Sequence, residues 1–94
     1  MGYFVLYAMK ALDGQGDAFA FALQDLAGEI CALPGGVTVQ ILRDTAETAS
    51  FVFIENWPSQ AAYEAGAKLL PGSAFAPLKP LLDGKPLRRV LTQV

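Results

Sequence analysis

The sequence predicts one α+β domain, residues 1–94, in which helices cover one face of a four-stranded antiparallel sheet. Two observations predict this fold class. Segments with the period of a strand and segments with the period of a helix follow one another, separated by proline and glycine. A chain of 94 residues also has room for only one domain and one core.

The first strand is predicted at residues 3–10, where aromatic and branched side chains occupy both alternating faces. Such a strand is typically central in its sheet. Glycines 14 and 16 then interrupt the pattern, and Asp17 is predicted to cap the helix that follows.

The first helix is predicted from its apolar spacing. Phe19, Leu23, Leu26 and Ile30 recur at steps of three and four residues, which places them on one side of a helix. The helix should end at residues 34–36, Pro-Gly-Gly, because proline disfavours helix in the residue before it and glycine permits a reversal.

Two antiparallel strands are predicted next, at residues 37–43 and 50–57. The connection between them, residues 44–49, is too short for a parallel crossover, which needs about a dozen residues or more.

The second helix should begin after Ser59, its predicted cap, and end near residues 71–72. Pro77 and Pro80 then limit the next apolar stretch to short helical turns. A last strand is predicted at residues 87–94. The order strand, helix, strand, strand, helix, short helix, strand is the split βαβ or ferredoxin-like plan, β-α-β-β-α-(α)-β.

Composition predicts self-association. Hydrophobic residues make up 53% of the chain and charged residues only 17%, against about 25% charged in ordinary domains. With helices on one face of the sheet, strands 3–10 and 50–57 still present apolar side chains on the other face. Large apolar patches mark partner surfaces and two sheets can pack face to face, so we expect a homodimer.

Charge and hydropathy exclude other partners. The net charge of -2 leaves no broad basic surface for nucleic acid, and Lys85, Arg88 and Arg89 are expected to protect the edge of the last strand. We expect no membrane partner and a cytoplasmic location, since no apolar run is long enough to span a bilayer and the first ten residues lack a secretory signal. Cys31 has no second cysteine to pair with and is expected to pack as a small hydrophobic residue.

Several motifs point to a known family. The run Phe51-Val52-Phe53-Ile54-Glu55-Asn56-Trp57-Pro58-Ser59 resembles the Phe-Val and Glu-x-Trp-x-Ser signature of the antibiotic biosynthesis monooxygenase family, a branch of the dimeric α+β barrel superfamily. The opening aromatic strand, Leu33-Pro34-Gly35 at the end of the first helix, and Ser73-x-Phe75 are in the same order as in that family.

The resemblance implies a dimer of ferredoxin-like units whose sheets form a barrel, with a pocket between sheet and helices in each subunit. Several members of the family oxygenate electron-rich aromatic substrates without metal or flavin. The resemblance thus implies an oxidoreductase that needs no cofactor and binds a small hydrophobic or aromatic molecule. Related branches degrade haem, isomerise small metabolites or have no assigned chemistry.

Trp57 matches the family tryptophan, which in catalytic members can face the pocket and orient a planar substrate by stacking. The same indole could instead be core or interface packing. Asn56 is a second candidate for substrate binding, although the period of two points it to the opposite face from Trp57.

Glu55 shares a strand face with Phe53 and Trp57, so it could be a catalytic carboxylate beside an apolar cavity, with a pKa raised by desolvation. Alternatively it could pair with Arg43 or Arg88 across the sheet.

Phe53 and the tyrosines Tyr7 and Tyr63 complete the candidate substrate-binding residues; the tyrosines could equally be buried side chains with one hydroxyl partner. The chain has no histidine. Haem-degrading relatives depend on a histidine ligand, and many oxygenase relatives carry a histidine in the region of residues 70–73. A zinc or haem site of ordinary ligands is therefore not expected.

Three functions fit these residues. The first is a cofactor-independent monooxygenase acting on a small aromatic or quinone-like substrate, which requires chiefly a dry pocket that binds the substrate anion and admits oxygen. The second is a non-catalytic ligand-binding or stress-associated barrel, favoured by the missing histidine. The third is an isomerase of small metabolites.

Overall fold

The computed structural model describes residues 2–94 and contains the predicted series of elements. They are β1 (Tyr3–Lys10), α1 (Gly16–Cys31), β2 (Thr38–Arg43), β3 (Ser50–Trp57), α2 (Gln60–Leu69), the 3₁₀ helices η1 (Gly72–Phe75) and η2 (Lys79–Leu81), and β4 (Leu87–Thr92). The short turns expected around Pro77 and Pro80 are these two 3₁₀ helices.

The strands form one four-stranded sheet in the order β2-β3-β1-β4, and all neighbours are antiparallel. β1 pairs with β3 from Tyr3 opposite Trp57 to Lys10 opposite Ser50. The two most apolar strands are therefore the central ones, and the α+β ferredoxin-like plan predicted from the sequence is confirmed.

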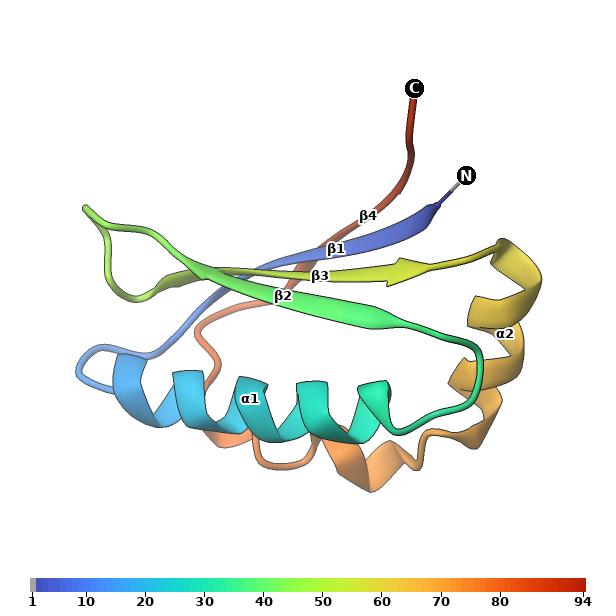
Figure 1. Ribbon diagram of the computed structural model, residues 1–94. Helices are drawn as coiled ribbons and strands as arrows, with labels where there is room; N and C mark the ends of the chain where they lie inside the picture. The colour runs from blue at the N-terminus through green and yellow to red at the C-terminus, as the bar shows by residue number, and fades with distance from the viewer. Residues whose placement is uncertain (1) are drawn as a thin grey trace.

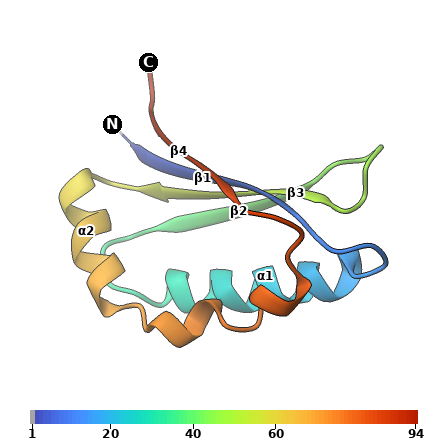
Figure 2. The ribbon, with the colours of Figure 1, turned by 180° about the vertical axis from the view of Figure 1, so that it is seen from behind.

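Helices cover one face of the sheet only (Figure 1). α1 runs beneath the strands, with η1 and η2 in the same layer, and α2 stands at the end of the sheet where β3 finishes. The reverse view shows the same two layers (Figure 2). No helix of residues 2–94 lies on the other face of the sheet, which we call the outer face.

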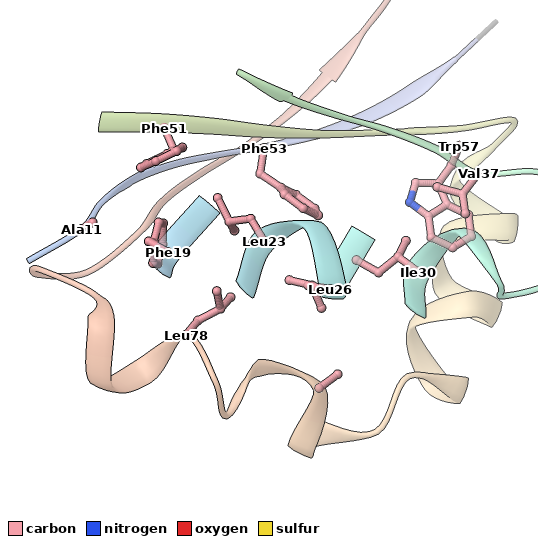
Figure 3. Packing of buried hydrophobic residues seen from close by; sticks show 11 residues of the cluster. Ala11, Phe19, Leu23, Leu26, Ile30, Val37, Phe51, Phe53, Trp57 and Leu78 are labelled. Carbon is pink, nitrogen blue, oxygen red and sulfur yellow. The ribbon is translucent and has the colours of Figure 1, made fainter. Parts of the chain in front are cut away.

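The core lies between the sheet and α1 (Figure 3). α1 buries the four residues that its spacing predicts, Phe19, Leu23, Leu26 and Ile30. Phe51 packs on Phe19 at one end, with ring centroids 5.3 Å apart. Trp57 lies beside Ile30 and Val37 at the other end, so β3 spans the whole length of the core.

The chain reverses after α1 at two glycines. Gly35 has a φ of 123° and Gly36 a φ of 74°, conformations that other residues rarely adopt. The Pro-Gly-Gly sequence thus ends α1 and turns the chain toward β2. α2 begins as predicted, because the Ser59 hydroxyl accepts a hydrogen bond from the amide of Ala62 at 3.1 Å.

The outer face is apolar over the two central strands. By the alternation of the strands it carries Phe4, Leu6 and Ala8 of β1 with Val52 and Ile54 of β3. Flanking apolar residues from the edge strands are Leu42, Leu87 and Leu91, and these three are 52%, 53% and 44% exposed.

Two local predictions are wrong, and the end of one strand differs from the prediction. Asp17 does not cap α1: the cap position is Gln15, and Asp17 lies in the first turn, where its carboxylate pairs with Arg43 at 2.9 Å. Cys31 is exposed because it follows the buried Ile30 and turns away from the sheet. β4 also ends at Thr92, two residues before the predicted end of the strand.

None of the helices in residues 2–94 combines the length and the apolar character needed to cross a membrane.

Candidate functional site

A cavity of about 460 Å³ opens between the sheet and the helical layer; we call it the main cavity. Its size lies within the range of small-molecule sites, about 300–1,000 Å³. Strands β1, β3 and β4 line one side, and α1 with the segment 75–86 lines the other. The lining residues are Tyr7, Met9, Leu26, Phe53, Glu55, Phe75, Leu78, Lys79, Leu82, Lys85, Pro86 and Arg88.

A smaller hollow of about 140 Å³, the side cavity, adjoins it toward α2. It shares the lining residues Tyr7, Glu55 and Phe75 with the main cavity, and Trp57 and Tyr63 also line it. Five of the six predicted site residues therefore surround this pair of cavities.

Glu55 is the only buried charged side chain in the part of the chain that the structure describes, with 6% of its surface exposed. Alternation along β3 places it between Phe53 and Trp57 on the face toward the helices. Its Oε1 accepts a hydrogen bond from Nε1 of Trp57 at 2.8 Å. Burial raises the pKa of Glu55, while the Trp57 hydrogen bond and the charge of Arg88 act in the opposite direction.

Neither arginine proposed from the sequence forms an ion pair with Glu55. Arg43 binds Asp17 instead, and the other ion pair within residues 2–94 joins Lys10 to Glu47. A carboxyl with one hydrogen-bond donor and little solvent retains capacity to accept a proton from a ligand in the cavity.

Trp57 is 2% exposed and its ring lies against α2. A Cβ at Gly66 would come within 2.6 Å of Cζ3 of the indole, so only glycine fits there without movement of the ring. Trp57 also meets Tyr63 edge to face, with ring centroids 5.7 Å apart. The indole is thus a packed side chain that holds Glu55 and touches only the side cavity.

Arg88 lines the main cavity and lies close to two tyrosines, Tyr7 and Tyr63. Its Nη2 donates a hydrogen bond to the Tyr63 hydroxyl at 3.0 Å. It also lies close to Tyr7, whose pKa is raised by burial and by Glu55, while Arg88 opposes that rise. Tyr7 therefore remains a hydrogen-bond donor within the cavity at neutral pH.

Asn56 lies apart from these residues. It is exposed and on the outer face, opposite Phe4 of β1, because successive residues of a strand point to opposite sides of the sheet. Phe53, by contrast, is 1% exposed and forms an apolar wall of the main cavity, edge to face with Tyr7 at 6.4 Å.

Sequence patterns assigned no role in this cavity to Lys79, Lys85 or Arg88, which all line it. The period of two shows that only one of the neighbours Arg88 and Arg89 in β4 can face the helices. This signal could have identified one arginine of the pair as a cavity residue. Among residues 2–94, no three cysteine, aspartate or glutamate side chains gather closely enough to hold a metal ion.

Comparison with known proteins gives a family match. The sequence model described as antibiotic biosynthesis monooxygenase matches residues 2–67. No curated protein matches the chain in sequence.

Solved structures match over nearly the whole chain. A candidate antibiotic biosynthesis monooxygenase of Chloroflexus aurantiacus is 23% identical, with a TM-score of 0.75 over 100% of this chain and 96% of that one. SnoaB, a cofactor-independent oxygenase of Streptomyces nogalater, is 19% identical, with a TM-score of 0.84 over 99% and 93%. Rv0793 of Mycobacterium tuberculosis is 15% identical, with a TM-score of 0.81 over 100% and 96%. At these identities the likeness shows a common fold.

Proposed function

The chain belongs to the antibiotic biosynthesis monooxygenase family, and we propose that it is a cofactor-independent monooxygenase acting on a small aromatic or quinone-like molecule bound in the main cavity. The observation that carries the proposal is an apolar cavity of about 460 Å³ with one buried carboxyl, Glu55, in its wall. A chain of this fold, SnoaB, is a cofactor-independent oxygenase.

The proposed chemistry needs a base and a dry site. A hydroquinone and O₂ give a hydroxyquinone and water: one oxygen atom enters the ring, the other leaves as water, and the substrate supplies all four electrons. Deprotonation of the substrate hydroxyl makes the ring electron-rich enough to form the C–O bond to oxygen. Loss of water then breaks the O–O bond as the carbonyl forms.

The residues around the cavity suit these steps. Glu55 accepts the proton, and its raised pKa makes it a stronger base than an exposed carboxylate. Trp57 holds the carboxyl in place through the 2.8 Å hydrogen bond. Tyr7 donates a hydrogen bond to the developing oxyanion, while Phe53 provides an apolar wall. Asn56, on the outer face, has no part in this scheme.

Oxygen labelling tests the proposal. Metal-free protein is incubated with polycyclic hydroquinones under ¹⁸O₂, and the hydroxyquinone is analysed for one labelled oxygen atom. We expect Glu55→Gln to lower the rate by about 100-fold or more, with Glu29→Gln, an exposed glutamate of α1, as the matched control. Product at only the spontaneous rate across the panel would overturn the proposal.

A second candidate function is ligand binding without catalysis. It is favoured by the absence of histidine from the chain and by the Trp57 hydrogen bond that already occupies one oxygen of Glu55. A hydroquinone that raises the melting temperature, because it binds only the folded state, and that yields no labelled product would support this alternative.

The proposal includes a cytoplasmic homodimer formed through the outer face. Eight apolar side chains lie on that face, and no helix of residues 2–94 covers them. Two copies of the sheet packed face to face would remove this surface from water, which is the main driving force for association.

A further inference from the structure

The main cavity collects positive charge in a protein that is negative overall. Three of the seven lysine and arginine residues line it, namely Lys79, Lys85 and Arg88, whereas one of the nine acidic residues, Glu55, does so. The net charge of the chain is -2. This concentration of cations is therefore local to the cavity.

The charges and the apolar surface occupy different parts of the cavity. Lys79, Lys85 and Arg88 are exposed and so form its mouth, whereas Leu78 and Phe53 are 7% and 1% exposed and form its interior. All three cations come from the segment 79–88, which crosses from η2 into β4. An occupant would meet apolar walls inside and positive charge at one rim.

The two lysines are not committed to carboxylates of the chain. The ion pairs within residues 2–94 use Lys10 and Arg43. Asp83 is the nearest acidic residue in sequence and lines a separate surface hollow that it shares with Lys85. One exposed aspartate leaves an excess of cations at the mouth of the main cavity.

Arg88 is the fixed member of the group. One of its five N–H donors is used by the Tyr63 hydroxyl at 3.0 Å, which holds the guanidinium at the edge of the cavity. A guanidinium held in this way can donate two parallel hydrogen bonds to a carboxylate. The lysines add charge that attracts the same group.

We propose that the ligand of the main cavity is an amphipathic aromatic carboxylate, whose rings fill the apolar interior and whose carboxylate lies at the mouth between Lys79, Lys85 and Arg88. The rings are inferred from the aromatic side chains Tyr7, Phe53 and Phe75 in the walls. This substrate class rests on the proposed function, since it takes the main cavity as the substrate site.

Two fluorescent probes of nearly equal size test the proposal, anthracene-2-carboxylate and its neutral primary amide. Each is titrated against the full chain at low salt. We expect the carboxylate to bind roughly tenfold more tightly than the amide, as two or three partly exposed charge contacts would give. The Lys79→Gln/Lys85→Gln variant should reduce this preference to about threefold or less. Lys68→Gln, an exposed lysine of α2 outside the cavity lining, should retain it.

Equal affinity for the two probes, no binding of either, or a preference that survives Lys79→Gln/Lys85→Gln would each overturn the proposal. The ¹⁸O₂ assay with neutral hydroquinones distinguishes this failure from that of the proposed function. Labelled product without carboxylate preference refutes the substrate class alone. Carboxylate preference without labelled product from any substrate refutes the oxygenase function alone.

Discussion

Two helical glycines form a matched pair that tests how tightly the site is packed. Gly66 in α2 is buried under the indole of Trp57, and an added Cβ would lie 2.6 Å from Cζ3 of that ring. Gly28 in α1 is exposed, and an added Cβ would meet nothing within 4 Å. Alanine at either position has the same helical backbone to adopt, so the two variants differ in the contact with Trp57.

The expected magnitudes follow from this contact. Alanine is more favourable than glycine in a helix interior by about 0.8–1.0 kcal/mol, so Gly28→Ala should raise the free energy of unfolding by about that amount. Gly66→Ala has the same gain but must displace a ring that is 2% exposed, and overpacking of this kind typically costs about 1–3 kcal/mol. The gain in helix propensity is the same in both variants and cancels when their free energies of unfolding are compared. Gly28→Ala should therefore be more stable than Gly66→Ala by about 1–3 kcal/mol.

Urea unfolding at one fixed protein concentration measures both values, because a dimer would make stability concentration-dependent. Trp57 is the only tryptophan of the chain, so its fluorescence reports directly on this site. Gly66→Ala should also change the emission and near-ultraviolet circular dichroism of the folded protein, and Gly28→Ala should not. Equal stabilities with an unchanged tryptophan signal would refute the close packing of Trp57 on α2.

Two further predictions concern Glu55 and the outer face. Burial raises the folded-state pKa of Glu55 above its ordinary value of 4.5. The folded state therefore binds more protons than the unfolded state, and the stability of the wild type should fall relative to Glu55→Gln as the pH rises from 4.5 through the folded-state pKa. The slope between the two pKa values should be at most about 1.4 kcal/mol per pH unit. Urea melts across pH 4–8 measure this, and a constant difference between the two proteins would contradict it. Leu6→Lys on the outer face should raise the dimer dissociation constant by about 100-fold or more, since twofold symmetry would bury the charge twice. The control is Phe21→Lys, at a residue of α1 that is 70% exposed, and its dimer dissociation constant should equal that of the wild type. Analytical ultracentrifugation measures these constants, and a monomeric wild type at micromolar concentration would disprove the interface.

The elements that sequence predicts well are those that depend on neighbours along the chain. Alternation placed Phe53, Glu55 and Trp57 on one face of β3, and the cap of α2 required only Ser59 and the amide of Ala62. The reversal after α1 needed only the Pro-Gly-Gly sequence. Each of these features is fixed by interactions across a few residues.

Long-range pairing decided what could not be predicted. Asp17 pairs with Arg43, 26 residues away, so its local preference for a cap position was overridden. Glu55 is a local exception: cross-strand arginines were one of its two predicted roles, yet its hydrogen-bond donor is the indole two residues along the same strand. The cationic mouth could not be predicted, because it depends on the path that the segment 79–88 takes around the cavity, and no local pattern encodes that path.

One strand carries both halves of the proposed function. β3 directs Glu55 and Trp57 toward the cavity and Val52 and Ile54 toward the outer face. Because the period of a strand is two, a slip of one residue in the pairing with β1 would bury Asn56 in the core and expose Glu55 on the apolar face. Trp57 would turn outward together with Glu55, because both lie on the same face of β3, so the hydrogen bond between them does not oppose the slip. The slip is opposed by the loss of Phe53 and Trp57 from the core. The apolar residues on the inner face of β3 thus fix the register that both positions the candidate base and creates the outer face.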